Sequence, residues 1–187
     1  MSLESYFEER IEIGDLLGEA NEYSLLNVYH SDLPKVLILS VASRFERDVT
    51  DHIETFYSEI SELEPVAAFV KKKALNRQYH SLFNWDAANV NAFVGLFGPQ
   101  CKAHFATQLV QHDWLNDAAR DFLALGQARN VLIHLDLATQ TASMTAQEVA
   151  EKYRSAVRFV EAIPFVLRLR PIPAREQGAP ESLEAAQ

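Results

Sequence analysis

The amino-acid sequence predicts an all-α protein with a long second helix and short extra helices. Apolar residues recur every three or four positions along most of the chain, which is the spacing of one helix face. The apolar–polar alternation of half-buried strands, with turn residues between them, is missing. The 187 residues suffice for one domain with a sizeable core, which we assign to residues 1–170.

The first predicted helix covers residues 3–21, where Tyr6 and Ile11 belong to an apolar set at helical spacing. Acidic residues fill its early turns, where the helix dipole favours negative charge. Gly14 and Gly18 weaken this segment, and they mark where a break in the helix is expected.

The second predicted helix has the clearest pattern. Ser31 or Asp32 can cap it, and Pro34 suits its first turn. Residues 36–39 are all apolar, and the positions that follow form a single apolar stripe as far as Ile60. A helix of about 27 residues is roughly 40 Å long at 1.5 Å per residue. Its start should be its most buried part, because that part is apolar on all sides.

Three shorter helices are predicted in the middle of the chain. Pro65 is expected to open the first of them, which runs through Leu75. Asp86 is placed to cap a short helix that Gly98 ends. Pro99 then starts the next helix, in line with the preference of proline for a first helical turn.

The only dense basic cluster of the sequence is Lys71, Lys72, Lys73 and Arg77. The plainer interpretation of this cluster is a solvated helix face. The alternative is a patch that contacts phosphate groups, with Lys72 as its candidate residue. The net charge of −9 argues against broad, non-specific binding of nucleic acid, but it leaves room for a local basic cleft.

The last predicted helix begins at a capping box, in which Thr145 is followed three residues later by Glu148. Pro164 should kink this helix or end it near Arg170. Residues 171–187 are rich in Pro, Gly, Ala and Glu and show no periodicity. We therefore predict a disordered C-terminal tail.

Composition limits the classes of protein that fit. No apolar run approaches the length of a membrane span, and the first residues lack the basic start and apolar centre of a signal peptide. Cys101 is the only cysteine, so the chain has neither an internal disulfide nor a thiol cluster for a metal. His80, His104 and His112 have no ligand-like spacing. We expect a cytoplasmic protein with no membrane association, no metal and no cofactor.

A long helix that starts near Trp114 ends in the stretch most suggestive of chemistry. Arg129 and His134 lie five positions apart with apolar residues between them, and Asn130 follows the arginine directly. Histidine takes and gives protons near neutral pH, and the arginine fork matches the oxygens of a phosphate group. RNA brings its own nucleophile, the 2′-hydroxyl. Arginine and histidine are therefore a minimal set for metal-free RNA cleavage, with Asn130 to hold the phosphate or orient the histidine.

Helix geometry adds a condition to this interpretation. Five positions correspond to about 140° around an ideal helix, so Arg129 and His134 should be splayed. Asn130 and His134 are four positions apart and share a face. A second copy of the chain across a two-fold axis could complete the site, which predicts a homodimer.

The spacing alone is weak, because any one fixed Arg–His spacing occurs by chance in roughly one such chain in three. Arg47 and His52 have the same spacing, with a polar and acidic interior, and we interpret that pair as a chance match. For His134 the plainer interpretation is a histidine facing the helix dipole. For Arg129 it is a surface ion pair, for example with Asp121 or Asp136.

The stretch from Arg129 to His134 resembles the signature of HEPN-domain ribonucleases, which is Arg, a polar residue, a short apolar run and His. The wider chain resembles the RiboL-PSP-HEPN and MAE-like groups of that family. The likeness extends over most of residues 3–170 as the order and spacing of elements, including residues 6–10, 41–46 and 84–85.

The resemblance implies an up-and-down helical bundle of the HEPN type, a homodimer with facing signatures, and metal-independent cleavage of an RNA substrate. Arg129 and His134 would be the catalytic pair, with Asn130 as their polar companion, and Glu46 would approach from the second helix. Family members act in toxin–antitoxin, phage-defence and RNA-processing systems, which makes an antitoxin protein a further expected partner. Competing interpretations are a catalytically silent dimerisation or partner-binding module and a bundle that binds a small ligand in a deep apolar pocket.

Overall fold

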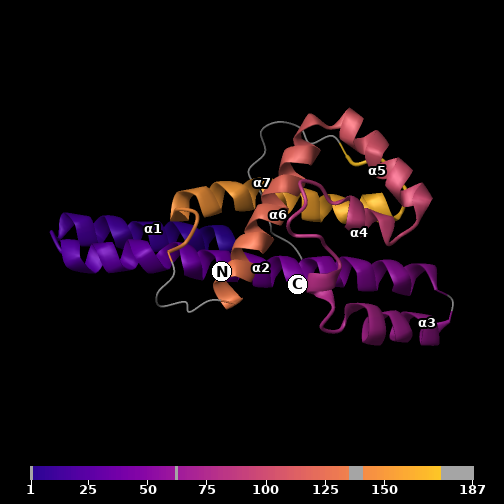
Figure 1. Ribbon diagram of the computed structural model, residues 1–187, viewed down its shortest axis with the longest axis horizontal. Coiled ribbons are helices and arrows are strands. Elements are labelled where there is room, and N and C mark those ends of the chain that lie inside the picture. Colours follow the sequence, from indigo (N-terminus) through magenta and orange to yellow (C-terminus); the bar gives the residue numbers. More distant parts are fainter. Residues whose placement is uncertain (1, 62, 135–140, 174–187) are drawn as a thin grey trace, which may run out of the picture.

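The computed structural model describes residues 2–61, 63–134 and 141–173. Over these residues the chain forms seven α-helices and no strand, which confirms the predicted all-α class. Helices α2 and α7 run side by side, and α6 crosses them (Figure 1). No helix of the described part is long and apolar enough to cross a membrane.

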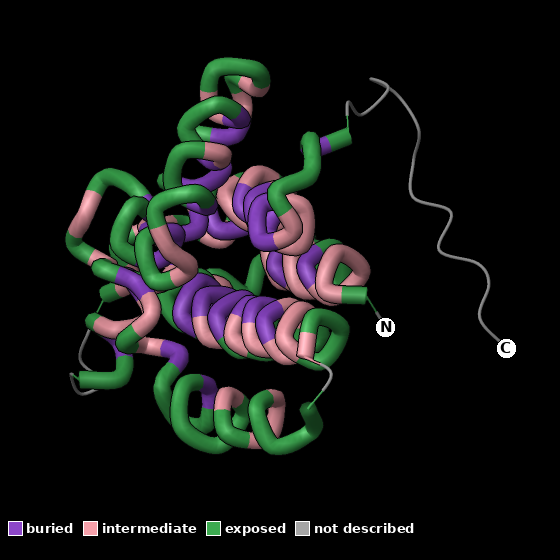
Figure 2. The backbone as a smooth tube through the Cα atoms, turned by 90° about the vertical axis from the view of Figure 1, so that its right-hand side faces the viewer, coloured by how far each residue is buried: buried purple, intermediate pink, exposed green. Residues whose placement is uncertain are grey.

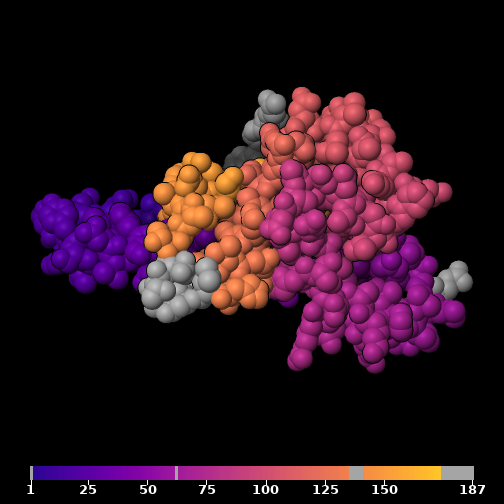
Figure 3. Space-filling model, viewed as in Figure 1, coloured from indigo at the N-terminus to yellow at the C-terminus, as the bar shows by residue number. Residues whose placement is uncertain are grey.

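Helices α1, Leu3–Glu19, and α2, Tyr23–Ile60, form an antiparallel hairpin that projects from the body of the molecule (Figures 1 and 3). The expected break in α1 is absent, so this prediction was wrong. Gly14 is buried, and a Cβ on it would lie 3.2 Å from His30 Nε2. Glycine therefore serves here to let the two helices approach each other, rather than to interrupt α1.

The predicted start of the second helix was also wrong. Helix α2 has 38 residues and encloses Pro34, which was expected in its first turn. The additional turns pack against α1, where the Tyr29 hydroxyl donates a hydrogen bond to the Arg10 carbonyl at 2.6 Å. This packing offsets the backbone hydrogen bond that a proline inside a helix removes.

The core lies where α2, α6 (Asp113–His134) and α7 (Ala146–Leu167) meet. Phe45, Phe122 and Phe159 come one from each helix and are almost fully buried. Each such burial stabilises the fold by roughly 1.5–3 kcal/mol. Figure 2 shows the buried residues on the inward faces of the helices and the exposed residues outside.

Helix α7 begins as predicted. The Thr145 hydroxyl accepts a hydrogen bond from the Glu148 N–H at 3.2 Å, and the Glu148 carboxylate accepts one from the Thr145 N–H at 2.7 Å. The helix continues through Pro164 to Leu167. The first residues of the predicted tail are ordered, because Ile172 is buried and its N–H donates to Gln108 Oε1 at 2.8 Å. Residues 174–187 of that tail lie outside the described residues.

Short elements cover the rest of the core. The third predicted helix consists of α3, Glu64–Phe69, and a π-helical continuation, Val70–Leu75. A 3-10 turn, Tyr79–Ser81, leads toward α4, Asn91–Gly95, and α5, Pro99–Gln111.

Asp86 does not cap α4, contrary to prediction, because that helix begins five residues later. The Asp86 carboxylate instead accepts a hydrogen bond from the Gln127 amide at 3.1 Å. Asp86 thereby ties the loop before α4 to α6, on the side where α6 carries the Arg–His stretch.

Candidate functional site

The last turns of α6 carry Asn130 and His134 on one side of the helix, as residues four apart must lie. Both residues line an open groove of about 550 Å³. The opposite wall of the groove belongs to the loop before α4, with Trp85 and Asp86 among its lining residues. The His134 side chain is exposed at the C-terminal end of the helix, where the dipole favours a cation.

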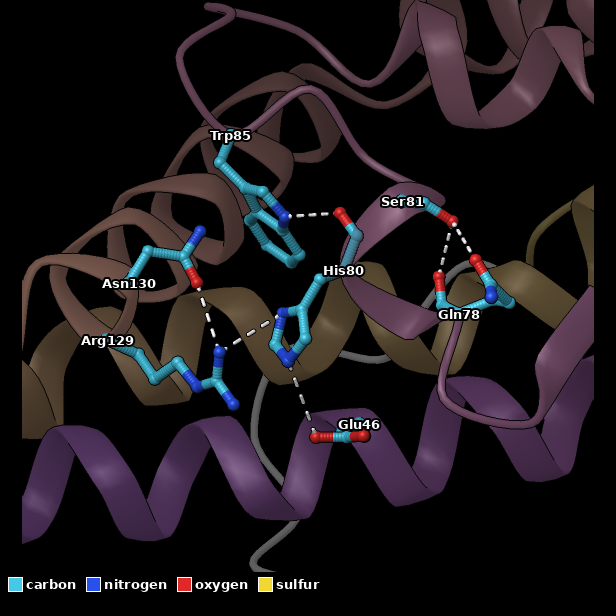
Figure 4. Close-up of polar contacts among 7 residues, drawn as sticks. All are labelled: Glu46, Gln78, His80, Ser81, Trp85, Arg129 and Asn130. Atoms are coloured by element: carbon cyan, nitrogen blue, oxygen red, sulfur yellow. Dashed lines mark hydrogen bonds and ion pairs between the residues drawn. The ribbon is translucent and has the colours of Figure 1, made fainter. Parts of the chain in front are cut away.

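Arg129 does not line this groove, and its side chain contacts the 3-10 turn. Its Nη1 lies 3.3 Å from Nδ1 of His80 and donates a hydrogen bond to Asn130 Oδ1 at 3.2 Å (Figure 4). The splay expected between positions 129 and 134 is thus present, and Asn130 contacts the arginine while lining the groove with the histidine. Asn130 therefore connects the Arg129 guanidinium to the groove through one hydrogen bond.

Glu46 lies on α2 and approaches the site through His80. Its Oε2 lies 4.0 Å from Nε2 of the imidazole (Figure 4). Hydrogen bonds thus join His80, Arg129 and Asn130, and Glu46 lies beside His80 at a distance too long for one.

His80 is the site residue that the sequence did not reveal. Its partner Arg129 is 49 positions away, so no local spacing could indicate the contact. The one available signal was its place just before the aromatic anchor at Trp85. Burial and the Arg129 charge lower the pKa of His80, Glu46 opposes them, and His134 lowers the pKa further. The imidazole is therefore neutral near pH 7.

The turn that carries His80 is held by Trp85. The indole Nε1 donates a hydrogen bond to the His80 carbonyl at 2.9 Å. The ring lies directly on Gly126 of α6, where a Cβ would be 2.0 Å from a ring carbon. Tyr79 is buried beneath the turn, and its pKa is raised by burial and by Glu46, with Arg129 opposing.

Lys72 lies apart from this cluster. It is exposed on the π-helix and does not line the groove. Its neighbour Lys71 forms an ion pair with Glu54 of α2 at 2.5 Å. The basic cluster thus has the features of a solvated helix face, and its contact with RNA stays a prediction.

Arg47 and His52, the second Arg–His pair with this spacing, make different contacts. The Arg47 side chain is largely exposed and lies 3.5 Å from the Asp48 carboxylate. His52 is half-buried farther along α2, and burial lowers its pKa, against the effect of Asp48 and Asp51. The two side chains take part in separate contacts, in keeping with a chance match.

The plainer interpretation of Arg129 was an ion pair with Asp121 or Asp136, and the structure bears on the first of these. Asp121 pairs with Lys152 at 2.6 Å, and Asp136 lies outside the described residues. Among the residues that the structure covers, no group of three or more His, Cys, Asp or Glu side chains is placed to hold a metal ion. Cys101 is buried, and burial raises the pKa of its thiol.

Chemically, the site combines a fixed cation, a neutral imidazole beside it, an amide, and a second imidazole exposed in a groove. These groups can bind a phosphate and move protons. Comparisons of the chain with protein-family models, with curated proteins and with solved structures gave no match.

Proposed function

We propose that this protein is a metal-independent endoribonuclease of the HEPN type that acts as a homodimer. The observation that carries the proposal is the coupling of Arg129 to the groove. Asn130 bonds to Arg129 and lines the same groove as His134. A phosphate in that groove would lie beside His134 and Asn130, and the Arg129 guanidinium is bonded to the same Asn130 amide.

Cleavage would follow from these groups without another reagent. A His134 imidazole takes the proton from the RNA 2′-hydroxyl, and the freed oxygen attacks the neighbouring phosphorus. Arg129 stabilises the charge that builds on the phosphorane oxygens. The bond from phosphorus to the 5′-oxygen then breaks, and that oxygen takes a proton from a second imidazole. The products are a 2′,3′-cyclic phosphate and a 5′-hydroxyl.

The groove suits a single-stranded nucleotide. Its lining combines the aromatic Trp85 with amides at Asn84, Gln127 and Asn130. Proteins read unpaired RNA bases by stacking them on aromatic rings and by hydrogen bonding to their edges. Local contacts of this kind are compatible with the overall charge of −9, which disfavours binding through surface charge alone.

A second copy of the chain is the partner that the end of α6 fits. Val131 is 50% exposed and Ile133 is 47% exposed, on the same turns as Asn130 and His134. Apolar side chains beside a two-fold axis form a self-complementary contact. Such a contact brings two His134 side chains toward one site, which supplies both the base and the acid.

The test is an RNA-cleavage assay that compares the wild-type protein with Arg129→Ala and His134→Ala. Each variant should lose about 100-fold or more in rate, because proton transfer and charge stabilisation each contribute at least that much. Arg47→Ala is the matched control, since it removes the arginine of the other Arg–His pair, and it should cleave like the wild type. Equal cleavage by all variants, or none by the wild type on any RNA, would sink the proposal.

In a cell, this activity fits a toxin or a phage-defence effector held in check by an antitoxin protein. Expression should then arrest growth, and His134→Ala should remove the arrest. His30→Ala, an exposed histidine on the projecting hairpin, provides the control and should leave the arrest unchanged. If the His134→Ala protein still arrests growth, the arrest does not depend on RNA cleavage.

A catalytically silent binding module is the second candidate, and the hairpin favours it. The tip formed by α1 and the start of α2 exposes large apolar side chains, each more than half accessible: Leu16, Tyr23, Leu25 and Val28. A face of this kind is typical of a surface that contacts another protein. This candidate predicts a harmless protein that cleaves no RNA and still associates with itself or a partner.

A further inference from the structure

His80 stands between Arg129 and Glu46, and these three residues come from three different elements: the 3-10 turn, α6 and α2. A guanidinium can only donate hydrogen bonds, so the Nδ1 atom of His80, 3.3 Å from Arg129 Nη1, must accept. The ring proton then sits on Nε2, on the side of the Glu46 carboxylate. The neighbours therefore select one neutral tautomer of the imidazole.

The His80 side chain is 39% exposed, and its position is set by the turn that carries it. The turn beneath it is held by the hydrogen bond from Trp85, and Trp85 is itself packed on Gly126. The space behind the ring is a cavity of only about 10 Å³, which His80 and Arg129 line together. A space of this size holds at most one water molecule.

His80 also lies outside the groove in which His134 is exposed. The groove is lined by Asn130 and His134, whereas His80 lines the small cavity on the other side of Trp85. Both ring nitrogens of His80 already face protein groups. This placement suits a residue that acts on Arg129 rather than on RNA.

We propose that His80 is a positioning residue, which holds the Arg129 guanidinium ready for the RNA phosphate while the nearby Glu46 carboxylate favours the imidazole proton on Nε2. The proposal rests on the ribonuclease function proposed above. A long arginine side chain is mobile when it is free. Holding it near its working orientation removes the need to order it during each turnover.

Lowering the pH should break the hydrogen bond between Arg129 and His80. The charged and titratable groups facing His80 are Arg129 and His134 of α6, Glu46 of α2, and Tyr79 of the same turn. Burial and Arg129 lower the pKa of His80, so the ring accepts from Arg129 near pH 7. Once the ring is protonated, Nδ1 carries a proton, the hydrogen bond is lost, and two cations face each other.

The test compares His80→Asn with His80→Ala in RNA cleavage. The Asn amide oxygen replaces Nδ1 as an acceptor for Arg129 but does not titrate, whereas Ala offers nothing. His80→Ala should lose about tenfold or more in kcat, as a misplaced catalytic group does, and His80→Asn should recover most of that loss. The rate of the wild type relative to His80→Asn should also fall as the pH is lowered from 7 to 5.

Two outcomes in this assay overturn the proposal. If His80→Asn is as slow as His80→Ala, the imidazole itself transfers a proton. If His80→Ala cleaves at the wild-type rate, Arg129 does not depend on it.

A second measurement does not require cleavage. Nitrogen-15 NMR of the imidazole rings in the wild-type protein should show His80 with its proton on Nε2. Arg129→Ala should shift the Nδ1 resonance of His80, and Arg47→Ala should not. A proton on Nδ1, or no response to Arg129→Ala, overturns the proposal. Failure of the wild type to cleave RNA overturns only the proposed function, because the NMR result stands independently of it.

Discussion

At the scale of single residues, the site depends on a glycine that does no chemistry. Gly126 lies inside α6, where glycine is normally unfavourable, and the Trp85 ring occupies the space that a Cβ would fill. Trp85 in turn bonds to the carbonyl of His80. The orientation of Arg129 therefore depends on the absence of one methyl group from the helix that carries it.

Gly126→Ala tests this dependence. The added Cβ would lie 2.0 Å from the indole, so Trp85 must move, and the fold should lose about 1–3 kcal/mol, as overpacked cores do. Gly95→Ala is the matched control, because nothing lies within 4 Å of its Cβ position in α4. Urea unfolding followed by circular dichroism measures both. Equal stability of the two variants would contradict the packing described here.

At the scale of elements, features that depend on neighbouring residues were predictable and those that depend on distant ones were not. The capping box at Thr145 and Glu148 is complete within four residues, and α7 begins where it indicates. The start of α2 was misjudged, because its early turns are stabilised by α1 rather than by a cap of their own. Sequence spacing read Pro34 as a start signal, and tertiary packing overrode it.

The same contrast applies to the candidate site. The shared face of Asn130 and His134 follows from helix geometry, so spacing alone gives it. The contact between His80 and Arg129 joins segments 49 positions apart, and it depends on how a turn without regular periodicity packs on α6. The sequence therefore indicated the α6 residues of the site and missed the imidazole between α6 and α2.

Thr145→Ala tests the start of helix α7, which depends on neighbouring residues alone. Loss of the hydroxyl that accepts from the Glu148 N–H should destabilise the fold by about 1 kcal/mol, as at other helix N-termini. Thr107→Ala is the control, since this exposed hydroxyl donates only to a carbonyl of its own helix, and its effect should stay within about 0.5 kcal/mol. Urea unfolding curves that share one slope give the change in the free energy of unfolding for both variants. A smaller loss for Thr145→Ala than for the control would refute the role of the cap.

At the scale of the whole molecule, the described chain exposes apolar side chains at several places, and two of these bear on the candidate functions. One is the tip of the projecting hairpin, with Tyr23 and Val28. The other is the end of α6, with Val131 and Ile133 beside the candidate site. Only the second can build a shared site from two copies, so the position of the dimer contact decides between the two candidate functions.

Val131→Glu tests that contact. A charge at the end of α6 should convert the proposed dimer into monomers and reduce the proposed RNA cleavage with it, because a buried unpaired charge is costly. Val110→Glu is the control, since Val110 is 83% exposed on α5, away from the site, and it should remain dimeric and active. Analytical ultracentrifugation and the cleavage assay give the two readouts. A wild-type monomer that cleaves RNA would show that one chain suffices.

Helix α2 also has a mechanical consequence. One unbroken helix connects the hairpin tip at Tyr23 to Glu46 in the site, a length of about 35 Å at 1.5 Å per residue. Between these two points the helix is a stiff rod that no loop interrupts. Pro34 is where that rod is weakest, because its ring nitrogen cannot donate to the preceding turn. Bending there would swing the hairpin while leaving Glu46, His80 and Arg129 in register.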